Sequence, residues 1–555
     1  MNVNSRSAAP LDSCPLSRRS LLGATAGAVA AGVSSVLVGC SAERPRSGGP
    51  TTSAAPAALA PPAYVPFAGV TPDRTGTGDG VAPVFYDYPA DPVRRDGFPL
   101  PAGPAWTALM PGRPPAVPPT ENRCYQAYRT AVGSDFQISY APPAQYIEKF
   151  QVAMAGGEVP DFAQIYTVAQ LPALLDKNFT DLTEVLSGDN ITMYPGLANI
   201  PTASWRIPEL NGRLWGVPLP RPPAGMVLTT RGDVLEARGI DDPNVELRDG
   251  QDFIDLLEQL TDKGRNQFAM GADPNLWLMR GIYTMIGGPN GWAVEDGRFV
   301  NQIETEQYRL ALVEASKIVQ SGYLHPNSFS EPGSNVQWFN AGTTALYFQW
   351  FVGWNSHARS HPEWKVGNIE LPRWGGGGMA PVLKNLAGFE AFIAIRKSED
   401  RRLEQLLRIA DYQASPFGTR EFLDANYGVA GYTYDMVDGN PVNRPAAASP
   451  GKVAMGYLGS NGGAVLYGAG DHASVDAQYE YLSRVIPRGV DDASWGLYSE
   501  TAATKGATMV KRQADVQRQV MLGQTTLAAW DEFVVSWKSE VGDAIAAEYA
   551  DAAAG

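Results

Sequence analysis

Short β-rich runs alternate with amphipathic helical segments through most of the chain, and this alternation limits the possible folds more than any other feature. Apolar residues recur at helical spacing in 146–154, 253–260, 308–319 and 403–410, and helices dominate after Asp515. Apolar β-rich runs predict strands at 106–110, 162–167, 345–351 and 391–395. Asp249 is expected to cap the helix over 253–260. Strands that alternate with helices predict an α/β architecture with mainly parallel sheets.

The N-terminal segment has the composition of an export signal. Arg18 and Arg19 precede an uncharged run, residues 21–38, which ends in the tetrad Leu37-Val38-Gly39-Cys40. A basic region followed by an apolar stretch is typical of a secretory signal, and paired arginines are typical of the twin-arginine type. We therefore expect residues 1–39 to be a signal peptide. The tetrad resembles the bacterial lipobox, which implies that Cys40 carries the lipid.

Two alternatives to this interpretation of the N-terminus stay open. A run of about 18 apolar residues is near the lower limit for spanning a bilayer, so a plain transmembrane anchor is one of them. The general secretory route is the other, because Leu21 and Gly23 depart from the usual twin-arginine pattern.

Residues 40–103 are dominated by Pro, Ala, Gly, Ser and Thr. A segment of this composition buries too little apolar area to order itself, which predicts a tether and N-terminal extension. The later part, around residues 84–89, contains Val, Phe and Tyr and is expected to lie against the folded body.

The cysteines and charges exclude several classes of protein. Of the three cysteines, Cys14 leaves with the signal and Cys40 takes the lipid, so the mature chain keeps only Cys124 and no intramolecular disulfide. We expect Cys124 to be a buried apolar residue. The formal net charge is -14 and no cluster of Lys and Arg occurs, which argues against a nucleic-acid partner. The 13 Trp and 23 Tyr suit a site that stacks flat ligand faces.

Common enzyme signatures are absent from the sequence. It contains no Gly-x-Ser-x-Gly elbow, P-loop or His-Glu-x-x-His pattern. His357 and His361 have the spacing of two metal ligands on a helix but lack a third, so we expect a surface pair and no metal or cofactor. Glu390 lies in an apolar run, which favours a buried structural carboxylate over a catalytic one. Paired carboxylates for glycoside hydrolysis stay possible, because they can lie far apart in sequence.

Several segments in a fixed order carry a family resemblance. They are residues 156–161, 210–218, 339–346 with Trp350 and Trp354 following, 369–372, 388–395 and 411–431. Together they resemble the family 1 extracellular solute-binding proteins of ABC importers, and among these the LplA/LipO-like lipoproteins. The match covers roughly residues 104–550. Ala430 departs from the pattern, since the LplA-like group usually has Glu there.

The resemblance implies a type II periplasmic-binding fold, in which two α/β lobes joined by hinge strands close on a ligand in the cleft between them. Lobe 1 is expected to hold residues 104–218 and 371–430, and lobe 2 residues 219–370 and 431–555. The implied function is a lipid-anchored, non-enzymatic, monomeric receptor that passes a carbohydrate, either an oligosaccharide or a modified sugar, to ABC permease subunits in the membrane. A secreted lipoprotein glycoside hydrolase and the ligand-binding component of a membrane sensor are the alternatives.

The ligand-binding residues follow from the same resemblance and from position near the hinges, although each aromatic residue also fits a core. The predicted set is Asp161, Gln164, Tyr166, Thr167, Trp215, Arg221, Trp277, Trp350, Trp354, Trp374, Phe389 and Glu390. Stacking of a Trp or Tyr on the C–H face of a sugar, with polar side chains on its hydroxyls, is the expected chemistry.

Overall fold

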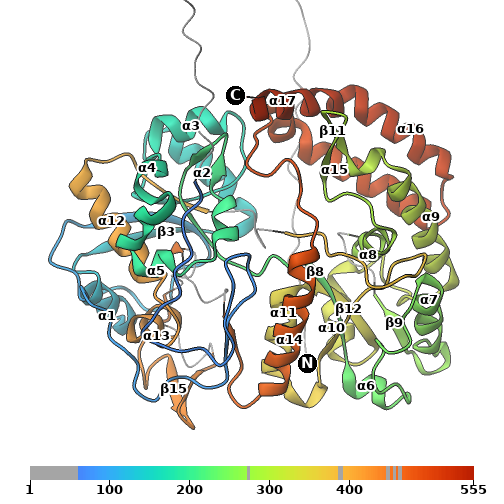
Figure 1. Ribbon diagram of the computed structural model, residues 1–555, viewed down its shortest axis with the longest axis horizontal. Coiled ribbons are helices and arrows are strands. Elements are labelled where there is room, and N and C mark those ends of the chain that lie inside the picture. Colours follow the sequence, from blue (N-terminus) through green and yellow to red (C-terminus); the bar gives the residue numbers. More distant parts are fainter. Residues whose placement is uncertain are drawn as a thin grey trace, which may run out of the picture. The chain divides into compact units, whose positions relative to one another are not determined.

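The structure is a computed structural model, and it describes residues 60–271, 276–385, 392–445, 451–453, 458–459 and 465–554. The predicted signal peptide, Cys40, Phe389 and Glu390 lie outside these residues. By its contacts, the chain from Ala55 onward forms one unit. Two separate β-sheets organise this unit, and each is packed with its own helices (Figure 1).

The first sheet has five strands in the order β3-β2-β4-β14-β7. Its strands are β2 (Trp106–Pro111), β3 (Phe136–Ala141), β4 (Phe162–Ile165), β7 (Val217–Pro218) and β14 (Phe392–Ile395). The helices that pack with it are α1 (Arg123–Ala131), α2 (Pro143–Ala155), α3 (Leu171–Asn178), α4 (Thr183–Leu186), α5 (Pro195–Ala198), α12 (Asp400–Gln413) and α13 (Arg420–Asn426). We call this sheet and its helices the first lobe.

The second sheet has four strands in the order β13-β8-β12-β9. Its strands are β8 (Met226–Thr230), β9 (Phe268–Met270), β12 (Thr344–Trp350) and β13 (Gly367–Ile369). Its helices are α6 (Gly232–Glu236), α7 (Gly250–Gln259), α8 (Trp277–Ile286), α9 (Glu306–Ser321), α10 (Asn335–Asn340), α11 (Phe351–Ser360), α14 (His472–Val485), α15 (Glu500–Met521), α16 (Leu527–Trp537) and α17 (Asp543–Ala554). We call this sheet and its helices the second lobe.

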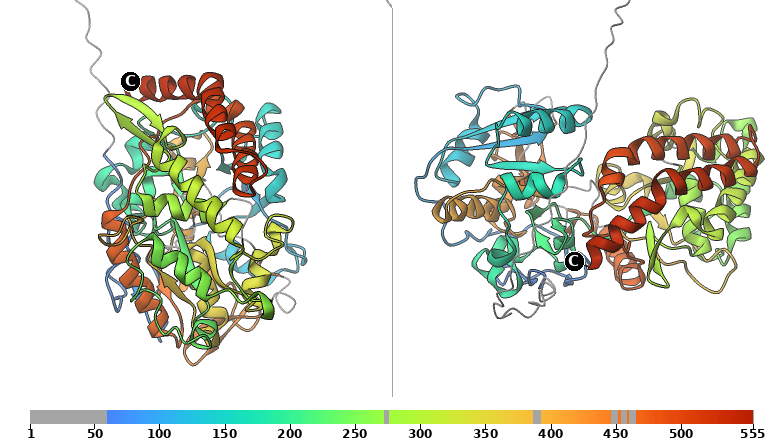
Figure 2. Two further views of the ribbon diagram at one scale, coloured as in Figure 1. Left: turned by 90° about the vertical axis from the view of Figure 1, so that its right-hand side faces the viewer. Right: turned by 90° about the horizontal axis from the view of Figure 1, so that it is seen from above.

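The C-terminal helices complete the second lobe. Helix α15 contacts α9, α16 and α17, and Figure 2 shows the three C-terminal helices together in red. Met509, Trp530 and Ile545 pack into the same core as the second sheet. Of the helices that the structure describes, none is long and apolar enough to cross a bilayer.

Among the residues that the structure describes, four two-stranded ribbons lie outside these sheets. They pair β1 (Val84–Phe85) with β17 (Leu466–Tyr467), β5 (Glu209–Leu210) with β6 (Arg213–Leu214), β10 (Trp292–Glu295) with β11 (Arg298–Asn301), and β15 (Tyr434–Val437) with β16 (Asn440–Asn443). The β1–β17 pair is parallel and the other three are antiparallel.

The predicted predominance of parallel pairing is wrong, because both sheets are mixed. Strand β2 is parallel to β3 and β4, and β12 is parallel to β9. The strands nearest the connections between the lobes run the other way: β14 is antiparallel to β4 and β7, and β8 is antiparallel to β12 and β13. A crossover helix forces parallel pairing only within a βαβ unit, and a strand that arrives from the other lobe lacks that constraint.

The predicted helices form where the apolar spacing indicated them. Helix α7 begins after Asp249, whose Oδ1 accepts hydrogen bonds from the backbone N–H groups of Gln251 and Asp252 at 2.9 and 3.0 Å. Phe253 and Leu257 on its apolar stripe are buried. The helix is therefore fixed by a cap at its start and by burial of one face.

Residues 60–103, which we call the strap, pack along both lobes. Residues 84–89 were expected to lie against the body, and the packed segment is longer than that. Val81, Val84 and Tyr88 are buried. Arg95 lies in the interior of the first lobe, where its guanidinium pairs with the Asp411 carboxylate.

The cores show which segments pack together, and the predicted lobe boundaries stay a prediction. Ile393, Leu407 and Tyr412 pack with the first sheet. Leu371 and Leu383 pack with the second sheet. Cys124 is buried in the first lobe as an unpaired thiol, as predicted.

Candidate ligand-binding cleft

A cleft of about 290 Å³ lies between the carboxyl end of β4 and the segment that follows α14. Its first-lobe wall is formed by Ile165, Tyr166, Thr167, Leu171, Arg206, Ile207, Glu209, Leu210 and Phe392. The facing wall is formed by Asp492, Ser494, Trp495, Gly496, Leu497 and Tyr549, with Asn385 between the two. The carboxyl ends of parallel strands at a domain interface are where ligands of α/β proteins usually bind.

Tyr166 and Thr167 reach the cleft because β4 ends one residue earlier, at Ile165. The Tyr166 hydroxyl accepts a hydrogen bond of 3.0 Å from Nε2 of Gln164, and its ring lies 5.5 Å from that of Tyr146. Gln164 itself is fully buried, and no donor of the described residues reaches its Oε1. The structure thus brings three of the predicted residues together at one strand end.

Two carboxylates line the cleft. Glu209 comes from β5, and burial raises its pKa while the nearby Arg206 lowers it. Burial also raises the pKa of Asp492. The Oδ1 of Asp492 accepts hydrogen bonds from the backbone N–H and the hydroxyl of Ser494, at 2.8 and 2.7 Å, and from the N–H of Trp292 at 3.2 Å. Both acids can accept hydrogen bonds from ligand hydroxyls.

Trp495 is held by an arginine of the opposite wall. The Arg206 guanidinium lies 5.3 Å from the centre of the Trp495 ring, within the range of a cation–π contact. The Nη1 of Arg206 also lies 3.4 Å from Oδ2 of Asp491. The Oδ1 of Asp491 lies 3.3 Å from Nζ of Lys384. Arg206 therefore forms an ion pair with Asp491, and its guanidinium also contacts the Trp495 ring at the cleft.

A smaller pocket of about 20 Å³ adjoins the cleft, because Asn385 lines both. Arg221 and Trp350, two predicted site residues, belong to this pocket. Trp350 stands edge-to-face against Trp277, with the ring centres 5.1 Å apart. Trp277 is thereby connected to the same region through Trp350.

Four other predicted residues have packing contacts away from the cleft. Asp161 is buried, with its carboxylate 2.7 Å from Arg396 and 2.9 Å from Arg402. Trp215 is buried in the first lobe, and Trp354 is buried with its indole N–H donating to the Val366 carbonyl at 3.0 Å.

The fourth, Trp374, is half-buried, and its ring lies against Gly250 at the start of α7. Phe389, Glu390 and Cys40 lie outside the described residues. The binding roles of all these residues stay predictions.

Most lining residues other than Tyr166 and Thr167 were missed by the sequence analysis, and those with the most ligand-binding chemistry include Arg206, Glu209, Asp492, Trp495 and Tyr549. These five lie outside the segments that carry the family resemblance. The only local signal is the run 491–495, in which two acids and a Ser precede a Trp.

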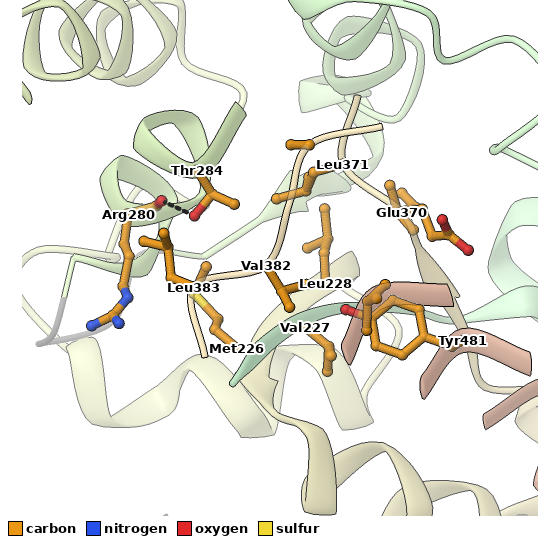
Figure 3. Close-up of a pocket in the computed structure, with 13 residues that line it drawn as sticks. Met226, Val227, Leu228, Arg280, Thr284, Glu370, Leu371, Val382, Leu383 and Tyr481 are labelled. Atoms are coloured by element: carbon orange, nitrogen blue, oxygen red, sulfur yellow. Dashed lines mark hydrogen bonds between the residues drawn. The ribbon is translucent and has the colours of Figure 1, made fainter. Parts of the chain in front are cut away.

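An internal pocket of the second lobe, shown in Figure 3, is too small for a sugar. Its volume is about 30 Å³, room for roughly one or two waters. Leu228, Leu371 and Val382 make its lining largely apolar. Arg280 directs its guanidinium away from Leu228 and Val382, while its backbone carbonyl accepts a hydrogen bond of 2.9 Å from Thr284 (Figure 3).

The described residues contain no group of three or more His, Cys, Asp or Glu side chains that could hold a metal ion. His357 lies with its Nδ1 3.0 Å from the Gly353 carbonyl oxygen. His361 stacks on Trp364, with the ring centres 3.6 Å apart. The two histidines thus have partners other than each other.

Comparisons with known proteins point to one family. The profile of the bacterial extracellular solute-binding proteins matches residues 124–449. Lipoprotein LipO of Bacillus subtilis (strain 168) is 21% identical over 468 residues, which cover 77% of this chain and 88% of that protein. The polygalacturonan/rhamnogalacturonan-binding protein YtcQ of the same bacterium is 21% identical over 454 residues, which cover 78% and 88%.

A solved structure shares the fold. The N-glycan transport solute-binding protein NgtS of Streptococcus pneumoniae superposes with a TM-score of 0.58 at 16% identity, covering 81% of this chain and 99% of that one. The predicted fold, two α/β lobes of the type II periplasmic-binding kind, is therefore confirmed.

Proposed function

This chain belongs to the bacterial extracellular solute-binding proteins, and we propose that it is a lipid-anchored receptor that captures a carbohydrate and delivers it to an ABC importer. One observation carries the choice of ligand. Aromatic faces and hydroxyl-binding groups lie together in one cleft between the lobes.

The chemistry of the cleft suits a sugar. Tyr166, Trp495 and Tyr549 offer aromatic rings, while Glu209 and Asp492 accept hydrogen bonds. A sugar presents apolar C–H faces that stack on such rings and hydroxyls that bind such acceptors. The volume of about 290 Å³ is near the lower end of small-molecule sites, roughly 300–1,000 Å³.

The named relatives support the same ligand class. YtcQ is a polygalacturonan/rhamnogalacturonan-binding protein, and NgtS is an N-glycan transport protein. Because these proteins share only 21% and 16% identity with this chain, they support a carbohydrate without indicating which one.

The test is a thermal-shift screen of the exported chain against mono- and oligosaccharides. A ligand at 100 times its dissociation constant should add about 2.7 kcal/mol to the free energy of unfolding. Trp495→Ala and Tyr166→Ala should each remove the shift. Trp374→Ala is the matched control, because Trp374 does not line the cleft. If no sugar in the panel raises the melting temperature, the ligand is not a carbohydrate.

A glycoside hydrolase is the second candidate, and one observation favours it. Two carboxylates, Glu209 and Asp492, line the same cleft, and a pair of carboxylates is the usual apparatus of glycoside hydrolysis. Incubation of the protein with oligosaccharides followed by chromatography decides between the two. A receptor leaves the oligosaccharides intact, whereas release of products that stops in Glu209→Gln or Asp492→Asn would identify an enzyme.

A further inference from the structure

The β1–β17 ribbon has its two faces buried in different cores. Val84 pairs with Leu466, and Phe85 pairs with Tyr467. Because successive side chains of a strand point to opposite faces, the two pairs face in opposite directions. Val84 and Leu466 pack in one core, whereas Phe85 and Tyr467 pack in another.

The two cores belong to different lobes. The core around Val84 contains Val227 of β8 and Trp354 of α11, both of the second lobe. The core around Phe85 contains Phe422 of α13, in the first lobe, and Phe417, which lies just before that helix. The rings of Phe85 and Phe417 stack with their centres 4.4 Å apart. The ribbon therefore joins the lobes through buried apolar contacts on both sides.

On both sides of β1, the strap contacts helix α14 of the second lobe. The Tyr86 hydroxyl donates to Oδ1 of Asp476 at 2.7 Å. The Tyr479 hydroxyl donates to the Thr75 carbonyl at 2.9 Å, and the Arg74 guanidinium lies 4.0 Å from the centre of the Tyr479 ring.

The two ends of the strap are bound to the first lobe. Near its start, the N–H of Val65 donates to the Ala198 carbonyl at 2.7 Å. Near its end, the N–H of Leu100 donates to the Ala131 carbonyl at 2.9 Å. The strap thus leaves the first lobe, contacts the second, and returns.

We propose that the strap is a clasp that holds the two lobes together along the β1–β17 ribbon. Moving the lobes apart at the ribbon would expose Val84 and Phe85 to water, which is unfavourable. Rotation about the ribbon can leave both side chains buried, so the clasp opposes separation of the lobes more than it opposes their rotation. The clasp acts on the lobes themselves and does not depend on which solute the protein binds.

Distance measurement between two spin labels tests the clasp. One label is placed on Val437→Cys, in the exposed part of β15, a strand whose Tyr434 packs with Phe422 of the first lobe. The other is placed on Ala477→Cys, on the exposed side of α14 in the second lobe, and the exported chain lacks residues 1–39 and carries Cys40→Ser. Cys124 is buried and stays unlabelled. Hydrogen exchange of residues 81–88 reports whether the strap is bound.

Two substitutions release the ribbon from opposite sides. Val84→Asp places a charge in the second-lobe core, and Phe85→Asp places one in the first-lobe core. Each should speed the exchange of residues 81–88 and give a longer, broader label distance. Val152→Asp is the control, because Val152 is 67% exposed on α2 and should leave one narrow distance. A wild-type distance in a variant with fast-exchanging strap amides would overturn the proposal.

A gentler variant serves if both Asp variants fail to fold. Arg74→Ala combined with Tyr86→Phe removes contacts between the strap and α14 that lie near the surface. A longer or broader label distance in this variant supports the clasp. Faster exchange of the strap with an unchanged distance overturns it.

Discussion

A buried ion pair between Arg95 and Asp411 fixes the strap to the first lobe. The two side chains are 4% and 2% exposed. Asp411 also accepts hydrogen bonds from the backbone N–H groups of Gly196 and Leu197, and Arg95 donates to the Ser415 hydroxyl at 2.8 Å. Both charged side chains therefore have hydrogen-bonding partners within the protein, and each compensates the buried charge of the other.

Removal of the arginine should be costly. Arg95→Met leaves the Asp411 carboxylate buried without its cation, so we expect the free energy of unfolding to fall by about 3–5 kcal/mol. Urea unfolding followed by Trp fluorescence measures this loss. Arg129→Met is the control, because Arg129 and Asp135 are 52% and 63% exposed and such pairs contribute about 0–1 kcal/mol. An equal loss in the two variants would contradict the assigned role of the pair.

The cleft acids should make stability depend on pH. Burial raises the pKa of Glu209 and of Asp492 in the folded protein. Arg206 opposes the shift at Glu209, and the hydrogen bonds from Ser494 and Trp292 oppose it at Asp492. The unfolded chain then loses these protons at lower pH than the folded one. Their ionisation therefore lowers the free energy of unfolding as the pH rises from about 4, the ordinary value for such acids, through the folded pKa.

Paired variants test this dependence. Glu209→Gln together with Asp492→Asn should remove the loss of unfolding free energy that these two groups cause as the pH rises above about 4, because the groups that ionise are gone. Urea titrations at several pH values give the two curves. If the curve of the double variant runs parallel to that of the wild type, the raised pKa values are wrong.

A helix or strand could be predicted from the sequence where the interactions that form it lie within that element. The apolar stripe and Asp249 cap predicted α7 because both act within one helix. The direction of β14 and β8 depends on partners more than 100 residues away in each case, so alternation alone gave the wrong pairing for them. The strap was underestimated for a similar reason: its few apolar residues are ordered by two cores that its own composition does not reveal.

The residues that line the cleft likewise fall into some that were predicted from the sequence and others that were not. Tyr166 and Thr167 were predicted from the family resemblance, and their place after a parallel strand puts them at its carboxyl edge, where ligands usually bind. Glu209, Asp492 and Trp495 meet only through tertiary packing of segments far apart in the sequence, and the run 491–495 is their only local signal.

At the scale of one helix, the cap of α7 should have a measurable effect. Asp249→Ala removes the acceptor for two backbone N–H groups and should cost about 1 kcal/mol of unfolding free energy. The control is Asp241→Ala, at an exposed aspartate outside any helix. Thermal unfolding compares the two, and equal melting temperatures would show that the cap contributes nothing.

For the whole molecule, the proposed anchor predicts where the protein is found. Cys40→Ser should release the exported chain, freed of residues 1–39, into the medium, because the lipid is the proposed attachment to the bilayer. Cell fractionation with palmitate labelling measures both anchoring and acylation. Cys124→Ser should stay membrane-bound, since Cys124 is buried in the first lobe. Membrane retention of the Cys40→Ser protein would exclude this anchor.

The described part of the body begins at residue 60, so only a short segment separates it from the proposed anchor at Cys40. On the proposed anchor, twenty residues separate Cys40 from residue 60, so whatever its conformation this stretch spans at most ~70 Å. If the whole of 40–103 were free, this limit would be ~220 Å. The volume within reach of the body, a half-sphere with that radius, would then be roughly thirty times larger. With the proposed anchor, the receptor would therefore reach only permeases that lie close to it in the membrane.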